Sequence, residues 1–281
     1  MARVFITGVR GKTGAALAAW LGANRRVQVR GGTSRPQLGA PAGVEPAAFD
    51  WAEPAGWAAA LEDVDAVYLM RPDVEDAPER VARLVAAAPA GARIVLLSEM
   101  GADQFGPDTW MAAAERAVTS ADRPWTILRP SWFQQVFTDD RYFRPAIVER
   151  GVIEMPTAGA GFSWIDARDI AAVAGHALTD DGHAGVVHTL SGPAAVPLEE
   201  VARELSAATA RPIRAVDVAP GDATAGLEPW LAEMVGHVYE RGCAGGFGEV
   251  TDDVRAVTGR AARSIESFVA EHAAVWTPVV A

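Results

Sequence analysis

The first 21 residues carry the feature that most constrains this chain. A short apolar stretch at 4–6 predicts a strand, and an alanine-rich stretch at 13–21 predicts a helix. Gly8, Gly11 and Gly14 are spaced through the turn that joins them. In this context the first glycine permits a tight turn, the second lets the backbone approach a pyrophosphate, and the third allows close helix packing. The segment predicts a dinucleotide-binding turn with phosphates at the helix N-terminus, although an ordinary strand-to-helix turn can share the spacing.

Charge and cysteine content exclude several classes of protein. The net charge of -11, without any basic run, argues against a nucleic-acid partner, because such binding needs clustered Lys and Arg. Cys243 is the only cysteine, so no internal disulfide can form. We expect no secretory signal, because the first apolar run is short and ends at a glycine turn, and no apolar run approaches the roughly 20 residues of a membrane span. We expect a soluble, cytoplasmic monomer or homodimer that binds neither membrane nor nucleic acid.

Strand and helix patterns alternate through the first half of the chain, which predicts parallel βαβ units. We therefore expect an α/β fold: a Rossmann-type doubly wound parallel sheet in 1–151, with a return strand near 186–190, and a smaller α/β cap in 152–281 that is mainly substrate-binding. The expected strands are 4–6, 27–30, 44–49, 66–69, 93–97 and 125–128, with helices at 13–21, 54–61, 77–88 and 109–119. Later elements are expected at 162–165 (strand), 166–178 (helix), 196–210 (helix), 213–218 (strand), 229–239, 251–257 and 264–273 (helices).

An ordered set of motifs extends over nearly the whole chain. It comprises 7–14, 49–51, 65–69, Glu115, 125–133, 164–171, 190–193 and 250–254. In this order the chain resembles the NmrA-like group of atypical short-chain dehydrogenases/reductases, which includes quinone-reductase-like proteins and ergot-alkaloid iminium reductases. The resemblance implies a nicotinamide cofactor and leaves the substrate open.

The end of the second expected strand favours NADP(H) over NAD(H). NAD sites usually place a carboxylate there and NADP sites an arginine, and the segment 29–35 has no carboxylate. We expect Arg35, supported by Ser34, to hold the 2′-phosphate, with Arg10 as a second candidate. The alternative is that both arginines are solvated surface residues. The predicted cofactor-binding residues are Thr7, Gly8, Arg10, Gly11, Lys12, Thr13, Gly14, Ser34, Arg35, Met70, and, by resemblance to an adenine-contacting position, Asp50 with Trp51.

The usual proton donor of the superfamily, a tyrosine with a lysine four residues later, is missing. Lys12 is the only lysine, and none of the three tyrosines has a lysine at that spacing. Reducing an ordinary ketone needs such a donor, which contributes about 10²–10⁴-fold in rate. An iminium, quinone or enone needs it less, because the electron-poor acceptor itself takes up the charge of the hydride. We therefore expect a medium-sized, aromatic or polycyclic substrate of that kind, in secondary metabolism.

Few polar side chains follow the strands at the expected carboxyl edge of the sheet. The predicted catalytic residues are Ser98, Glu99 and Arg71. The alternative for Glu99 is a purely structural ion pair with Arg71, and the alternative for Ser98 is that it caps the next turn. Trp132, Phe133, Trp164 and Asp166 are the predicted substrate-binding residues, and cap packing is the alternative for the aromatic rings. The histidines lack metal-ligand spacing, so no metal is expected, and nothing near Cys243 would lower the pKa of its thiol.

Two other functions remain open. A catalytically silent NADP(H)-sensing regulator would use the same cofactor site, and a non-redox cyclase or isomerase would use Glu99 or Asp166 as a base.

Overall fold

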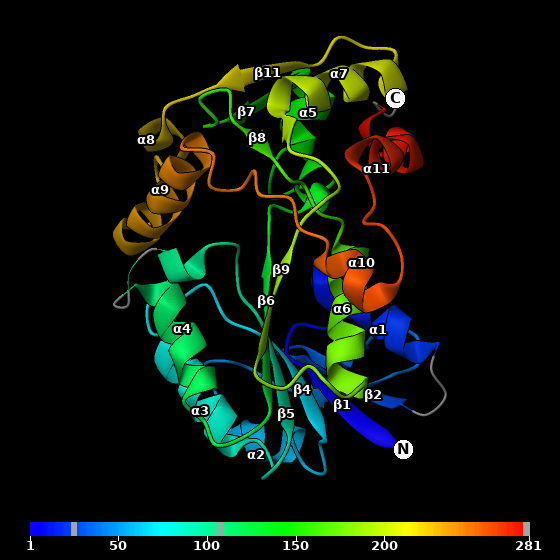
Figure 1. The fold of residues 1–281 in the computed structure, drawn as a ribbon, viewed down its shortest axis with the longest axis vertical. Coiled ribbons are helices and arrows are strands. Elements are labelled where there is room, and N and C mark those ends of the chain that lie inside the picture. Colours follow the sequence, from blue (N-terminus) through cyan, green and yellow to red (C-terminus); the bar gives the residue numbers. More distant parts are fainter. Residues whose placement is uncertain (24–26, 105, 107–108, 278–281) are drawn as a thin grey trace. The chain divides into compact units, whose positions relative to one another are not determined.

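The computed structural model describes residues 1–23, 27–104, 106 and 109–277. The chain divides into two compact units, coloured along the sequence in Figure 1. Unit 1 contains residues up to 130 together with 167–189 and 256–258, and unit 2 contains 131–166, 190–255 and the residues from 259 onward. The expectation that 152–281 serves mainly as a substrate-binding cap concerns a role and stays a prediction.

Unit 1 is built on a seven-stranded sheet. Its strands are β1 (Ala2–Ile6), β2 (Val27–Thr33), β3 (Val44–Ala48), β4 (Ala66–Met70), β5 (Arg93–Leu97), β6 (Trp125–Pro130) and β9 (Val186–Leu190). The order is β3-β2-β1-β4-β5-β6-β9, and the neighbouring strands from β3 through to β6 run parallel. The order reverses between β1 and β4, which is the position where doubly wound sheets bind ligands. The predicted fold class is confirmed, and β9 joins the sheet where a return strand was expected.

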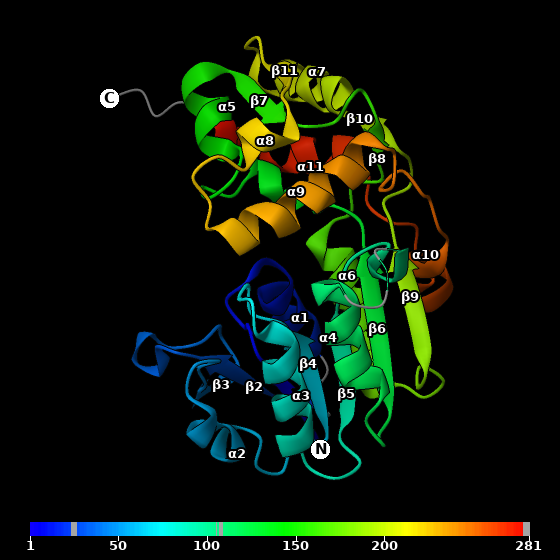
Figure 2. The same ribbon diagram turned by 90° about the vertical axis from the view of Figure 1, so that its left-hand side faces the viewer.

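Two layers of helices cover this sheet. Helices α1 (Lys12–Gly22) and α6 (Ala167–Thr179) lie on one face, and α3 (Ala77–Ala87) and α4 (Trp110–Thr119) on the other (Figure 2). Gly175 permits the close approach of α6 to α1, because a Cβ there would lie 2.2 Å from the Trp20 ring.

The α3 face holds an apolar core. It includes Phe5, Phe49, Trp57, Leu69, Val81, Leu84, Ile94, Leu96 and Ile127. The helix predicted at 54–61 forms only as the 3₁₀ turn η2 (Pro54–Gly56) and the short α2 (Trp57–Ala60). Proline and glycine are weak helix formers, and Trp57 Nε1 is held by the Asp50 carbonyl at 2.7 Å, which anchors the segment as a turn. Two further 3₁₀ turns are η1 (Pro36–Leu38) and η3 (Ala102–Gln104).

Unit 2 contains two small sheets. Strand β7 (Val152–Met155) pairs in parallel with β11 (Arg214–Asp217), and β8 (Gly161–Phe162) pairs antiparallel with β10 (Val196–Pro197). Its helical segments are α5 (Arg144–Arg150), α7 (Leu198–Thr209), α8 (Pro220–Ala223), α9 (Pro229–Cys243), α11 (Ile265–His272), η4 (Gln134–Phe137) and η5 (Ala273–Trp276). Helix α10 (Asp253–Thr258) has residues in both units.

The strand predicted at 162–165 is shorter than expected. The Ser163 N–H donates to the Phe247 carbonyl at 2.8 Å, and Ile165 instead pairs with Phe133. Helix α5 and strand β7 were not predicted, and α5 buries only Ile147, so it lacks an apolar periodicity. No helix in the described ranges has both the length and the apolar character needed to cross a bilayer.

Candidate functional site

The glycine turn between β1 and α1 is tightly fixed to the end of β4. Thr7 Oγ1 accepts from the Met70 N–H at 2.9 Å and donates to the Met70 carbonyl at 3.2 Å. A Cβ at Gly14 would lie 2.1 Å from the Gly8 carbonyl oxygen, so only glycine lets α1 start this close to the turn. Close helix packing, the role expected for Gly14, is therefore present.

Met70 lies over the other two glycines. A Cβ at Gly8 would be 2.5 Å from Met70 Cε, and one at Gly11 would be 3.2 Å from the same atom. The Met70 sulfur accepts a hydrogen bond from Thr13 Oγ1 at 3.3 Å. Helix α1 begins at Lys12, and its N-cap residue Gly11 makes no side-chain cap. Glycines at an uncapped helix start suit a pyrophosphate, so these residues, with the unbranched Met70 side chain beside them, fit a dinucleotide cofactor.

The two arginines predicted to hold a 2′-phosphate meet at one hydroxyl. Thr33 ends β2, and its Oγ1 accepts from Arg10 Nη2 at 2.8 Å and from the Arg35 backbone N–H at 3.1 Å. Thr33 itself is buried, whereas Arg10, Ser34 and Arg35 are exposed. Thr33 therefore links the Arg10 guanidinium to the Arg35 backbone at the end of β2, a contact that sequence reasoning missed.

Asp50 and Trp51 follow β3. Asp50 Oδ1 accepts from the Ala52 N–H at 2.8 Å, which fixes the turn. Trp51 packs edge-on against Phe49 and Trp57, with ring centroids 5.2 and 5.6 Å away. These contacts hold the two residues in place, and their adenine-contacting role stays a prediction.

Arg71 and Glu99 form the ion pair that was the alternative for Glu99. Arg71 Nη2 lies 3.0 Å from Glu99 Oε2, and the two side chains are 13% and 21% exposed. The Arg71 guanidinium also stacks on Trp110, 4.4 Å from the ring centroid. Trp110 is at the start of α4, nearly forty residues from Arg71 in sequence, and no sequence pattern indicated the contact.

Ser98 belongs to a buried charged network. Its hydroxyl donates to Glu115 Oε1 at 2.6 Å. Arg129 donates to the same carboxylate, from Nε to Oε1 at 3.0 Å and from Nη2 to Oε2 at 2.6 Å. Arg129 Nη1 also pairs with Asp103 at 2.7 Å. The hydrogen bond to Glu115 is the largest cause that raises the pKa of Arg129. Because the Ser98 hydroxyl donates its hydrogen to Glu115, the Ser98 oxygen can act only as an acceptor toward any other group.

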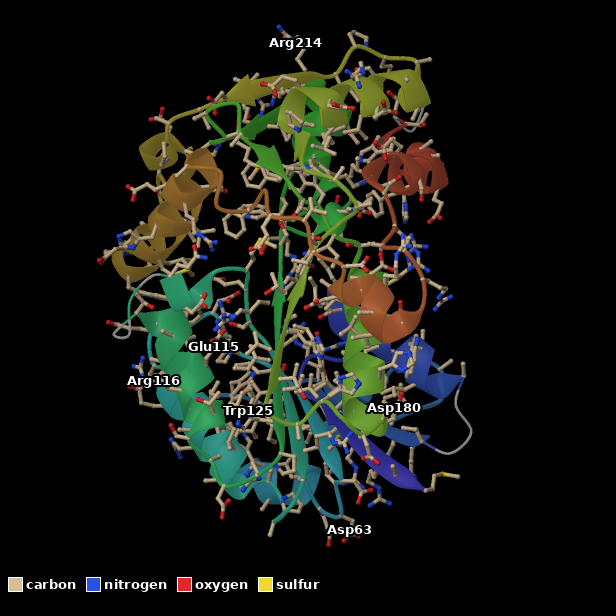
Figure 3. The ribbon with its side chains drawn as sticks, in the orientation of Figure 1. Asp63, Glu115, Arg116, Trp125, Asp180 and Arg214 are labelled. Atoms are coloured by element: carbon tan, nitrogen blue, oxygen red, sulfur yellow. The ribbon has the colours of Figure 1, made fainter. Side chains whose placement is uncertain are left out.

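Glu115 lies on the sheet-facing side of α4, while its neighbour Arg116 lies on the outer side (Figure 3). A buried glutamate on an otherwise apolar helix face was the signal for this network. The sequence analysis used Glu115 only as part of the family resemblance.

In unit 2, Trp132 lies within an aromatic cluster. Its ring stacks on Tyr239 at 5.7 Å and meets Phe162 and Phe247 edge-on. Trp132 and Phe133 are half-buried, and their backbone segment pairs with Ile165. Sequence reasoning missed Tyr239, whose pKa burial raises.

Trp164 and Asp166 are fully buried. Phe162 stacks on Trp164 at 5.0 Å, Phe137 meets it edge-on at 5.0 Å, and its indole N–H donates to the Val196 carbonyl. These contacts favour the packing alternative for Trp164. Asp166 Oδ1 accepts from Gln135 Nε2 at 3.0 Å.

None of the tyrosines resembles the missing proton donor. Tyr68, the only tyrosine of unit 1, is fully buried on β4, and burial raises the pKa of its phenol well above the usual range. Tyr142 and Tyr239 belong to unit 2, and Lys12 is in unit 1, at the start of α1.

Other reactive groups give no second site. Burial is the main cause that raises the pKa of the Cys243 thiol, with Asp217 adding to it, so less of this thiol is ionised at neutral pH. Within the described ranges, no three His, Cys, Asp or Glu side chains gather as metal ligands would.

Comparison with known proteins places the chain in a family. A model of the NAD(P)H-binding family matches residues 8–181. The NAD(P)H azoreductase of Xenophilus azovorans is 36% identical, covering 83% of this chain and 84% of that protein. The (4-alkanoyl-5-oxo-2,5-dihydrofuran-3-yl)methyl phosphate reductase of Streptomyces griseus subsp. griseus is 33% identical, covering 98% and 99%.

Solved structures share the fold. The NADPH-dependent quinone oxidoreductase of Escherichia coli, in complex with NADPH, has a TM-score of 0.78 at 22% identity, covering 95% of this chain and 99% of that chain. The negative transcriptional regulator NmrA, in complex with NAD, has a TM-score of 0.74 at 16% identity, covering 96% and 94%.

The sheet order and the glycine turn define a Rossmann-type fold of the kind that binds dinucleotides. The chain belongs to the NAD(P)H-binding family and is an NAD(P)H-dependent oxidoreductase. The predicted family, fold and enzyme class are confirmed.

Proposed function

We propose that this protein transfers hydride from NADPH to an electron-poor acceptor, an iminium, quinone or enone, without a tyrosine proton donor. The observation that carries the proposal is the burial of Tyr68, the only tyrosine in the unit that contains Lys12. A phenol that is fully buried, with a raised pKa, is a poor acid for a substrate oxygen. Substrates that need no strong acid suit such a unit best.

The redox balance differs among these acceptors. NADPH supplies two electrons and one hydrogen nucleus as hydride. An iminium becomes a neutral amine with no proton required, whereas a quinone or an enone also takes one proton from water to give the hydroquinone or the saturated ketone.

The preference for NADPH over NADH rests on the residues around Thr33. Arg10 contacts Thr33 through its guanidinium and Arg35 through its backbone N–H, so both residues are anchored at the end of β2. Arginine suits the dianionic 2′-phosphate, because a guanidinium presents a fork of donors to phosphate oxygens. We assign Arg10 and Arg35 to that phosphate, with Ser34 beside them. Gly8, Gly11 and the start of α1 hold the pyrophosphate in this proposal.

Ser98 is proposed to accept a hydrogen bond from a ribose or substrate hydroxyl. The Ser98 hydroxyl already donates to Glu115, so its oxygen can take part in a further hydrogen bond only as an acceptor. In unit 2, the half-buried Trp132, stacked with Tyr239, is the proposed contact for a flat acceptor, with Phe133 next to it.

The test is NADPH absorbance followed against a panel of quinones, iminium ions and enones. Oxidation of NADPH that depends on any of these acceptors supports the reductase. Tight NADPH binding with no turnover across the panel would favour the sensing regulator instead. Product formation without NADPH consumption would favour the isomerase or cyclase.

A further inference from the structure

The ion pair between Arg71 and Glu99 leaves one polar atom of each side chain unpaired. Arg71 Nη2 donates to Glu99 Oε2 at 3.0 Å, which uses one arm of the guanidinium and one carboxylate oxygen. Arg71 Nε and Glu99 Oε1 are both shielded from solvent and have no hydrogen-bond partner in the described part of the chain. Buried donors and acceptors without partners cost free energy, so two in one ion pair point to a missing partner.

The chemistry of the two atoms defines that partner. Arginine and carboxylate usually pair through two parallel hydrogen bonds, and Nε with Nη2 is one fork that can make them. Here only the Nη2 arm is used. Nε can only donate, and an ionised carboxylate oxygen can only accept. The missing partner must therefore accept a hydrogen bond from Arg71 and donate one to Glu99.

The position of the pair is that of a ligand-binding group. Arg71 directly follows β4, and Glu99 follows β5 by two residues. Both therefore lie at the carboxyl edge of the sheet, next to the reversal of strand order between β1 and β4. Trp110 fixes Arg71 by stacking, and its own indole N–H is held by the Val74 carbonyl at 2.9 Å. The guanidinium is thus held in one orientation.

The charge of the pair sets the class of ligand. Arg71 and Glu99 together carry no net charge, so they offer little attraction to a cation. A neutral group with an acceptor beside a donor satisfies both atoms at once.

We infer that the Arg71–Glu99 pair recognises an acceptor in which a hydroxyl group lies beside the reducible carbonyl. Arg71 Nε–H donates to the carbonyl oxygen, and Glu99 Oε1 accepts from the hydroxyl. This inference rests on the proposed function and narrows its acceptors to hydroxyquinones and hydroxyenones. Donation from Arg71 also stabilises the negative charge that reaches the carbonyl oxygen with the hydride.

The test compares two quinones that differ by one hydroxyl. They are 5-hydroxy-2,3-dimethyl-1,4-naphthoquinone and 2,3-dimethyl-1,4-naphthoquinone, whose ring methyl groups prevent addition to Cys243. Binding of each to the protein saturated with NADP⁺ is measured by quenching of tryptophan fluorescence. The hydroxyquinone should bind the wild-type protein about tenfold more tightly, because its hydroxyl adds one hydrogen bond to the charged Glu99 carboxylate that the parent quinone cannot make.

Two variants and a control locate the effect. Arg71→Lys keeps the positive charge but removes the Nε–H, and Arg71→Met/Glu99→Leu removes both charges, so that neither is left buried alone. The double variant should reduce the tenfold preference to about one, whereas Arg71→Lys should weaken the binding of both quinones and keep the preference. Arg123→Lys is the matched control, because Arg123 Nε is also buried and unpaired while its Nη1 contacts the Ala88 carbonyl. The control should keep the wild-type preference.

Equal binding of the two quinones by the wild-type protein, binding of neither, or a preference that survives in the double variant would overturn the inference. Arg71 Nε and Glu99 Oε1 would then form their hydrogen bonds with water. A hydroxyl preference without NADPH oxidation would support the recognition site and refute the proposed reduction, so the two failures are distinguishable.

Discussion

Arg10 Nη2 donates to Thr33 Oγ1 across 2.8 Å, which ties the glycine turn to the end of β2. The same hydroxyl accepts from the Arg35 backbone N–H. Gly31 and Gly32 precede this point, and a Cβ at Gly31 would lie 2.7 Å from Val9 Cγ1. Packing therefore keeps positions 31 and 32 of β2 free of larger side chains.

Cofactor choice should follow these arginines. We expect NADPH to bind at least about tenfold more tightly than NADH, equivalent to ~1.4 kcal/mol. Arg35→Ala should remove most of this difference, Arg10→Ala part of it, and Arg116→Ala on the outer side of α4 none. Calorimetric titration of each variant with both cofactors measures it. Equal affinities in the wild-type protein would contradict the assignment.

Gly14 and Gly22 provide a matched pair for the packing of α1. Gly14→Ala places a methyl group 2.1 Å from the Gly8 carbonyl oxygen and should cost about 1–3 kcal/mol of unfolding free energy. Gly22→Ala meets nothing within 4 Å and should not destabilise the protein. Urea unfolding of the two variants tests this, and similar midpoints would refute the packing role.

A substitution at Gly11 should abolish cofactor binding without preventing the protein from folding. A Cβ there would be 3.2 Å from the Gly8 carbonyl oxygen, which requires only a small adjustment. Gly11→Val should therefore fold but lose NADPH affinity, because its branched side chain fills the space next to the pyrophosphate. Circular dichroism checks the fold and calorimetry the affinity. Near-native affinity in the folded variant would mean that the cofactor binds elsewhere.

Removing the Glu115 carboxylate should lower the free energy of unfolding more than removing the Ser98 hydroxyl. Glu115→Ala leaves Arg129 with only Asp103 and should destabilise the protein by about 3–5 kcal/mol. Ser98→Ala removes one hydrogen bond to a carboxylate that Arg129 still holds, so it should cost about 1.5–3 kcal/mol. Chemical denaturation of both variants measures the difference. A larger cost for Ser98→Ala than for Glu115→Ala would refute this network.

His183 should make stability depend on pH. Burial is the largest cause that lowers its pKa, His176 and Arg93 lower it further, and Asp180 opposes them. The unfolded chain then takes up the proton first as pH falls through about 6.5, so the free energy of unfolding should fall with pH. His183→Asn keeps a polar atom near Nδ1, which lies 3.1 Å from His188 Nε2, and should weaken the fall. Unfolding curves between pH 8 and 5 test this; an unchanged slope would contradict it.

Local patterns were enough to predict the sheet but not its contacts. The strands of unit 1 are short apolar runs between turn signals, and burial on both faces makes such runs easy to recognise. Helix α5 and strand β7 were not predicted from the sequence, because neither has a distinctive periodicity or length. Both are short, and tertiary pairing with β11 stabilises β7.

The candidate site shows the same limit. The glycine spacing and the missing carboxylate in β2 are local signals, and they predicted the cofactor turn. Thr33 and Trp110 gain their roles only from contacts with Arg10 and Arg71, which lie 23 and 39 residues away in sequence. Such long-range contacts leave no pattern in a single sequence, whereas Glu115 could have been noticed as a charge on an apolar helix face.

The central claim is hydride transfer from NADPH to an electron-poor carbon. The most direct measurement uses NADPH carrying deuterium at the transferred position of C4 and an enone acceptor, followed by mass spectrometry of the product. We expect one deuterium on the β-carbon of the saturated ketone for each NADPH oxidised. A reduced product without deuterium at that carbon, or a product formed while NADPH stays intact, would contradict it.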